Sequence, residues 1–256
     1  MLYIARNIVY AGCLRYNQSD NCFMTSTCWI NSMTHTSTPG PDWAQIDDVL
    51  LDMDGTLLDR HFDNFFFEEE LPRRYAAKYG LEAADAREKL FAMYRKVEGE
   101  LNWTDLHYWT KTLDIDVVAM TKEFDHMIGF LPYAEEFLRH LRAKGKRVHL
   151  VTNAHMAGVA IKVEKTGLNR HVHRILDAFE VGYLKMRAEY WPSCQQLIGF
   201  DPKRTLYLDD DESCLNAAQE FGIGHVYHSA QSSSQLPPQR SMRHHSIDSL
   251  AVFILP

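Results

Sequence analysis

The sequence predicts an α/β fold, with a three-layer, Rossmann-like parallel sheet core and an inserted helical cap domain. After residue 130, short apolar segments alternate with segments of helical periodicity, which is typical of parallel strands joined by helices. A long helix-rich stretch separates the first apolar segment from the second. Apolar residues make up 46% of the 256 residues, which is ample for a globular core.

The domain boundaries follow from this alternation. Residues 1–45 are expected to be an N-terminal extension that is disordered or not native, with Met33 as an alternative start that would remove residues 1–32. Residues 46–60 and 130–256 form the predicted Rossmann-like core, and residues 61–129 form the predicted helical cap.

The first strand, Val49–Asp52, ends in a carboxylate, and a second one, Asp54, follows two residues later before a Gly-Thr turn. Ligands of open parallel sheets bind at the carboxyl ends of the strands. Carboxylates at that place can hold a hard cation such as Mg²⁺ and can attack an electrophile. A polar loop is the simpler interpretation, since Asp and Gly are common turn residues.

Three groups of apolar residues at helical spacing predict the cap helices. We expect Pro72 to break the first helix, Thr104 to cap the third, and Glu68–Glu70 to form a solvated face. The three groups are Phe62, Phe65 and Phe66; Leu90, Phe91, Tyr94 and Val97; and Leu106, Trp109 and Leu113.

Two aromatic residues of the cap, Trp103 and Tyr108, are candidates to contact the base of a ligand. Packing inside the cap is at least as good an interpretation for each of them.

The next segments are a helix, Pro132–Lys144, and a strand, Arg147–Thr152, followed by Asn153. A threonine at a strand end, with backbone N–H groups just after it, can bind phosphate oxygens. Threonine also simply favours strands, so this signal is weak by itself.

A lysine that reaches a phosphate is expected between this strand and the next acidic segment. Lys162 and Lys165 fall in a helix over residues 155–166, where we expect a solvated surface. Lys185 lies in a loop before the next helix, and we favour it for this reason.

The third acidic segment is the strand Thr205–Leu208, which runs into Asp209, Asp210 and Asp211. Because side chains alternate along an extended chain, we expect one of Asp209 and Asp210 to bind a metal and the other to lie behind it. Asp211 is expected to cap the following helix. The remaining predicted elements are a weak strand at 175–179, helices at 187–198 and 212–221, a strand at 224–227, and a loop at 229–245 with solvent-exposed His244 and His245.

These segments, in this order, resemble the haloacid dehalogenase superfamily of phosphohydrolases over about residues 46–227, and in particular bacterial GMP/IMP nucleotidases. The resemblance implies that Asp52 is the nucleophile and Asp54 the acid and base. It also implies that Asp52, Thr152, Asn153 and Lys185 bind phosphate. Besides the strand ends, it rests on Val49–Asp59, Phe62–Asn64, Leu101–Trp103, Thr152–His155, Thr166–Leu168 and Gly182–Tyr183.

The implied activity is a Mg²⁺-dependent phosphomonoesterase with an aspartyl-phosphate intermediate, acting on purine nucleoside 5′-monophosphates such as GMP or IMP. The implied metal ligands are Asp52, Asp54, Asp209 and Asp210. A small sugar-phosphate phosphatase or phosphomutase with the same chemistry is one alternative, and a catalytically silent binding module is another.

Two departures from the family pattern stand out. Leu184 and Met186 flank Lys185 where related proteins carry proline, which is expected to loosen the lysine loop. Asp211 replaces a small residue and is expected to add negative charge near the metal.

Composition argues against nucleic-acid and membrane partners, whereas the resemblance implies a small-molecule phosphomonoester. The net charge of −7 argues against nucleic-acid binding through a basic surface. No segment approaches the roughly 18 apolar residues of a membrane span. Five cysteines without metal-type spacing favour a reduced, cytoplasmic location.

Overall fold

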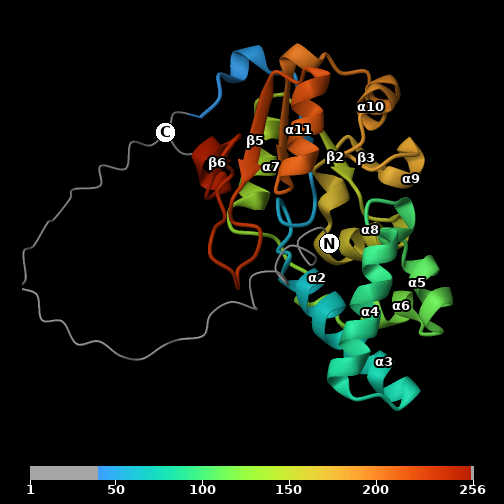
Figure 1. Ribbon diagram of the computed structural model, residues 1–256. Helices are drawn as coiled ribbons and strands as arrows, with labels where there is room; N and C mark the ends of the chain where they lie inside the picture. Colours follow the sequence, from blue (N-terminus) through green and yellow to red (C-terminus); the bar gives the residue numbers. More distant parts are fainter. Residues whose placement is uncertain (1–39, 255–256) are drawn as a thin grey trace, which may run out of the picture.

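The protein is built around a six-stranded parallel sheet with the strand order β3-β2-β1-β4-β5-β6 (Figure 1). The structure, a computed structural model, describes residues 40–254. The expectations for residues 1–32 and for Met33 lie outside the described residues. The strands are β1 (Asp48–Leu51), β2 (Arg147–Thr152), β3 (Arg174–Asp177), β4 (Thr205–Asp209), β5 (His225–Ser229) and β6 (His245–Ile247).

Helices make up most of the remaining regular structure. Those between β1 and β2 are α2 (His61–Phe65), the π-helical η2 (Phe66–Glu70), α3 (Leu71–Tyr79), α4 (Ala83–Val97), η3 (Leu101–Trp103), α5 (Leu106–Leu113), α6 (Val117–Glu123), η4 (Asp125–Met127) and α7 (Ala134–Ala143). Those before β1 or after β2 are η1 (Trp43–Gln45), α8 (Met156–Thr166), η5 (Leu168–Arg170), α9 (Ala178–Val181), α10 (Tyr190–Ile198), η6 (Pro202–Arg204), α11 (Glu212–Phe221) and η7 (Leu250–Phe253).

Both faces of the sheet are covered, because side chains alternate along each strand. Val49 and Leu51 of β1 belong to an apolar cluster that includes α7 and η7. Leu50 belongs to a second cluster with α10 and α11 on the opposite face. The predicted three-layer α/β core with a parallel sheet is therefore confirmed.

Strand register brings the predicted site segments to one edge of the sheet. Leu51 is paired with Leu150 on β2 and with Leu208 on β4. The Asp52 N–H donates to the Leu208 carbonyl at 3.0 Å. The residues that follow these three paired positions must therefore emerge side by side.

The regular structure from α2 to η4 is entirely helical, and Figure 1 shows α3, α4, α5 and α6 grouped at one end of the sheet. The two connections between the sheet and this helical segment, residues 57–59 and 129–131, lie side by side. The Asp59 N–H donates to the Gly129 carbonyl at 2.9 Å, and the Leu131 N–H donates to the Leu57 carbonyl at 2.9 Å. The exact division into core and cap stays a prediction.

Three local expectations for the cap are wrong. Pro72 does not break the first helix: the chain stays helical from α2 through η2 to α3, and the π-helical turn of η2 directly precedes the segment that holds Pro72. Asp105, not Thr104, caps α5, and its Oδ1 accepts from the His107 N–H at 2.8 Å. Glu70 is buried, because Arg73 and Arg74 neutralise it from the next turns.

The core differs from expectation at three places. The weak strand ends at Asp177, because this residue caps α9 with hydrogen bonds to the Phe179 and Glu180 N–H groups. The expected loop at 229–245 ends in β6, which adds an edge strand beside β5. His244 is buried rather than exposed and its Nε2 lies 2.9 Å from Asn216 Oδ1.

Within residues 40–254, no helix has both the length and the apolar character required to cross a bilayer.

Candidate active site

Three carboxylates gather at the carboxyl ends of β1 and β4. Asp52, Asp209 and Asp210, called the acidic cluster below, each offer an oxygen, and these oxygens lie within 4.8 Å of one another. Buried carboxylate oxygens are the donors that a hard cation such as Mg²⁺ prefers, so these residues fit such an ion.

Asp209 and Asp210 both contribute an oxygen to the acidic cluster, although β4 itself ends at Asp209. The expectation that one of them binds a metal directly and the other lies behind it stays a prediction. Asp211 caps α11 as expected, with its Oδ1 accepting from the Ser213 N–H at 2.8 Å.

Lys185 reaches the acidic cluster from the loop before α10. Its Nζ pairs with Asp52 and lies 2.7 Å from Asp209 Oδ2, and its side chain is buried. The backbone of Lys185 is held on both sides: its N–H donates to Asn153 Oδ1 at 2.8 Å, and its carbonyl accepts from Trp191 Nε1 at 3.0 Å. The loop is thus anchored without the usual proline, contrary to the loosening expected from the sequence.

Electrostatics in the cluster depend on these cations. Burial raises the pKa of Asp52 well above its ordinary value, and Lys185 opposes the shift. Burial raises the pKa of Asp210 to about 6, against the lowering effect of Arg60, which pairs with it. Burial lowers the pKa of Lys185, but Asp209 and Asp52 outweigh this effect and leave it raised. Arg60 is a site residue that the sequence analysis missed.

Thr152 and Asn153 lie at the end of β2, beside the acidic cluster in the sheet. Both line the pocket that the cluster faces, and Thr152 is buried. The Thr152 Oγ1 accepts from the Ala154 N–H at 3.0 Å, so its own proton remains available for a ligand oxygen. The side-chain oxygen of Asn153, Oδ1, already accepts from the Lys185 backbone N–H, so Asn153 also positions the lysine.

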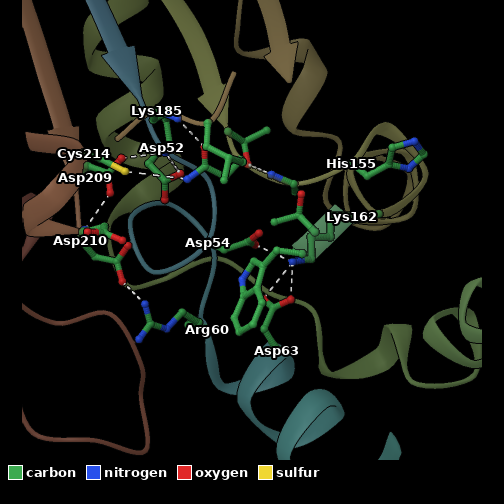
Figure 2. Close-up of a pocket in the computed structure, with 18 of the residues that line it drawn as sticks. Asp52, Asp54, Arg60, Asp63, His155, Lys162, Lys185, Asp209, Asp210 and Cys214 are labelled. Carbon is green, nitrogen blue, oxygen red and sulfur yellow. Dashed lines mark hydrogen bonds and ion pairs between the residues drawn. The ribbon is translucent and has the colours of Figure 1, made fainter. Parts of the chain in front are cut away.

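The second carboxylate of the first motif, Asp54, meets a different lysine. Lys162 Nζ lies 2.7 Å from Asp54 Oδ1 and 2.7 Å from Asp63 Oδ1; these three residues are called the Lys162 triad below. Figure 2 shows the triad apart from the acidic cluster, within the same pocket.

The expectation that Lys162 is a surface residue is therefore wrong. Its side chain is 6% exposed, whereas that of Lys165 is 36% exposed, as expected. Lys162 lies one turn after Gly158 on the buried face of α8, so helical spacing was a signal that could have found it. Asp63 was noted only as part of a family-like stretch.

The two candidate base-binding aromatics have different surroundings. Trp103 is buried and lines the pocket. Tyr108 is not among the residues that line it, and its ring packs on Trp109 with a centroid distance of 5.1 Å. Helix α5 turns Leu106 and Trp109 inward, three residues apart, so the structure favours the packing interpretation for Tyr108.

The family model of haloacid dehalogenase-like hydrolases matches residues 46–222. The chain belongs to this family. Its membership and the nucleotidase relative described next make it a phosphoric monoester hydrolase.

One curated relative and two solved structures illustrate the similarity. The chain is 37% identical to the GMP/IMP nucleotidase YrfG of Escherichia coli over 206 residues, which is 80% of this chain and 93% of that protein. A HAD phosphatase from Thermococcus onnurineus shares the fold, with a TM-score of 0.70 and 19% identity over 80% of this chain and 95% of the other. A HAD family enzyme of Bacteroides thetaiotaomicron, a mutant crystallised with magnesium and inorganic phosphate, has a TM-score of 0.54 and 17% identity over 73% of this chain and 95% of the other.

Proposed function

We propose that this phosphohydrolase removes phosphate from purine nucleoside 5′-monophosphates, GMP or IMP, through an aspartyl-phosphate intermediate and with Mg²⁺. One observation carries the chemical part of the proposal. Two carboxylates that are two residues apart in the sequence line one pocket. Asp52 lies in the acidic cluster and pairs with Lys185, whereas Asp54 pairs with Lys162. Phosphoryl transfer through an enzyme-bound phosphate needs a nucleophile and a proton donor. Asp52 and Asp54 would fill these two roles from separate surroundings.

The nucleophile in this proposal is Asp52. Its carboxylate oxygen attacks phosphorus, an acyl-phosphate bond forms, and the bond from phosphorus to the leaving oxygen breaks. Lys185 and the Thr152 hydroxyl bind the non-bridging oxygens, where charge shifts in the transition state. Both groups are already in place beside Asp52, so little reorganisation is required.

Asp54 serves as acid and then as base. It gives its proton to the leaving oxygen, and in the second step it takes a proton from the water that cleaves the acyl phosphate. Burial and the neighbouring Asp63 raise the pKa of Asp54, while Lys162 opposes the shift. A raised pKa suits a carboxyl group that must carry a proton at the start of the reaction.

The metal would be held by the carboxylates of the acidic cluster and by the backbone carbonyl of Asp54. The Asp54 side chain pairs with Lys162, so Asp54 would serve as a ligand through its backbone carbonyl alone. When bound, Mg²⁺ supplies positive charge that neutralises the phosphate and the buried carboxylates. The Bacteroides neighbour crystallised with magnesium and phosphate supports this choice of ion.

The leaving group would be bound by the cap. The strand-end residues recognise only phosphate, so discrimination between esters must come from the other walls of the pocket. Among these walls are the apolar side chains of Phe62, Phe67 and Leu106 and the indole of Trp103, which suit a flat purine. The choice of GMP and IMP is supported by the name of the Escherichia coli relative.

A phosphate-release panel tests the proposal. Purified protein with Mg²⁺ is assayed against nucleoside 5′-monophosphates, hexose phosphates and phosphoglycolate, with chelator as the blank. We expect IMP and GMP to have the highest kcat/KM and the chelator to abolish release. Sugar phosphates far above the nucleotides would replace the nucleotidase by the sugar-phosphate alternative, and no turnover on any ester would favour a silent binding module.

A further inference from the structure

Trp103, one of the residues that line the pocket, carries a buried indole N–H that no group within residues 40–254 accepts. Trp103 is 2% exposed. Most buried polar groups in folded proteins are paired. The other two fully buried tryptophans follow that rule: Trp109 Nε1 donates to the Trp103 carbonyl at 2.9 Å, and Trp191 Nε1 donates to the Lys185 carbonyl at 3.0 Å.

The position of this indole is fixed by its neighbours. The backbone N–H of Trp103 donates to the Glu100 carbonyl at 3.0 Å, and the backbone carbonyl of Trp103 accepts from Trp109 Nε1. The ring of Tyr94 meets the indole edge-on, with a centroid distance of 5.9 Å. A side chain held by its own backbone and by α4 and α5 cannot turn away to find another partner. The unpaired donor is therefore a built feature of the pocket.

We propose that the Trp103 N–H donates to the 6-oxo group of the substrate base and so selects 6-oxopurine over 6-aminopurine nucleotides. This inference rests on the proposed nucleotidase function. An indole N–H donates and cannot accept, so it requires an acceptor on the ligand. Hypoxanthine and guanine both present a carbonyl oxygen at C6, whereas adenine presents an amine there, which would oppose one donor with another.

The apolar surroundings strengthen this selection. Phe62, Phe67 and Leu106 line the same pocket and offer no side-chain acceptor. A ligand that supplies an acceptor pairs this buried donor and gains a hydrogen bond, whereas a ligand without one leaves it unpaired as before. Sites built to hydrogen-bond a substrate group discriminate against analogues that lack it. Trp103 thereby acts as a specificity-determining residue.

The test removes the donor and the acceptor separately. The ratio of kcat/KM for IMP to that for purine riboside 5′-monophosphate, which has hydrogen at C6, is measured in the wild-type protein and in Trp103→Phe. We expect the wild-type ratio to be about tenfold or more, as for one hydrogen bond, and to fall close to one in the variant. Trp43→Phe is the matched control: it also removes an indole N–H, but Trp43 packs on Phe137 and Phe253, and the ratio should keep its wild-type value.

The outcomes separate this inference from the function on which it rests. If the wild-type protein hydrolyses IMP and GMP best but Trp103→Phe keeps the wild-type ratio, the inference is wrong and the nucleotidase function stands. If the wild-type protein prefers other esters over both nucleotides, both proposals are wrong. Should Trp103→Phe not fold, as judged by its melting curve, the wild-type ratio decides: a value near one overturns the inference, and a value of about tenfold or more supports it.

Discussion

Asp52 and Asp54 differ mainly in the cation that each one meets. Lys185 comes from the loop before α10 and stabilises the ionised form of Asp52, while Lys162 comes from α8 and pairs with Asp54. Asp54 also has the carboxylate of Asp63 nearby, which raises its pKa. Two chemically identical residues, two positions apart, thereby have surroundings that suit the different roles proposed for them.

Replacing the proposed nucleophile should abolish turnover. In Asp52→Asn the amide cannot form an acyl phosphate, and Lys185 keeps Asp209 as a partner, so the fold should persist. Phosphate release from IMP and a melting curve measure the two effects. Retention of even a few per cent of activity, with contamination excluded, would remove Asp52 as nucleophile.

Replacing the proposed acid should discriminate between leaving groups. Asp54→Asn keeps the shape of the side chain but cannot donate a proton as an acid. We expect a loss of roughly 10²-fold or more on IMP and a much smaller loss on p-nitrophenyl phosphate, whose leaving group needs little protonation. Equal losses on the two substrates would contradict the acid role.

Helix α8 connects the core to the cap through its buried face. Lys162 extends from this helix to Asp54 after β1 and to Asp63 in α2, the first cap helix. One turn earlier, a Cβ added at Gly158 would lie 3.5 Å from Leu106 Cδ1 of α5, so the two elements are already in close contact. The Lys162 triad is therefore a structural junction as well as part of the pocket.

The two lysines of α8 should differ sharply in stability measurements. Lys162→Met leaves two carboxylates without their cation, and breaking a buried ion pair costs roughly 3–5 kcal/mol, here toward the lower end because Asp54 is partly exposed. Lys165→Met, the matched control, removes only an exposed pair with Asp125 and should cost less than about 1 kcal/mol. Urea unfolding of both variants measures the difference, and similar losses would contradict the structural role of Lys162.

At the scale of the whole molecule, the site lies where the sheet edge meets the cap. The fold buries three carboxylates in one place, and burial raises the pKa of Asp210 to about 6. Because the pKa of Asp210 in the folded protein is above its ordinary value, the protonated carboxyl group contributes to the free energy of unfolding at low pH. This contribution is lost as the pH rises through about 6. A divalent cation would compensate for that loss, since it binds the ionised carboxylates.

Stabilisation by Mg²⁺ should therefore depend on pH. We expect the rise in Tm on adding Mg²⁺, relative to chelator, to be larger at about pH 7.5 than at about pH 5, because protons compete with the metal at the lower value. Asp210→Asn should reduce the difference between the two conditions. An equal rise at both pH values, or none, would argue against metal binding at the acidic cluster.

Much of this arrangement could be predicted from local sequence. The strands that end in Asp52, Thr152 and Asp209 were recognisable by their apolar runs, and parallel strands necessarily end at one edge of the sheet. The helix α11 and its cap, Asp211, were predictable for a similar reason, since capping depends on residues close in the sequence. The roles proposed for these residues stay predictions.

Local periodicity and the residue that follows each strand were enough to predict the α/β class, the order of the strand-end carboxylates and the place of Thr152, and a loop position favoured Lys185 among three lysines. Packing between distant segments set the rest: Lys162 rather than Lys165 enters the pocket, Arg60 and Asp63 join it, and Trp103 rather than Tyr108 lines it. The physical reason is that the inward face of a helix is set by packing against segments distant in the sequence, which helical spacing alone does not specify.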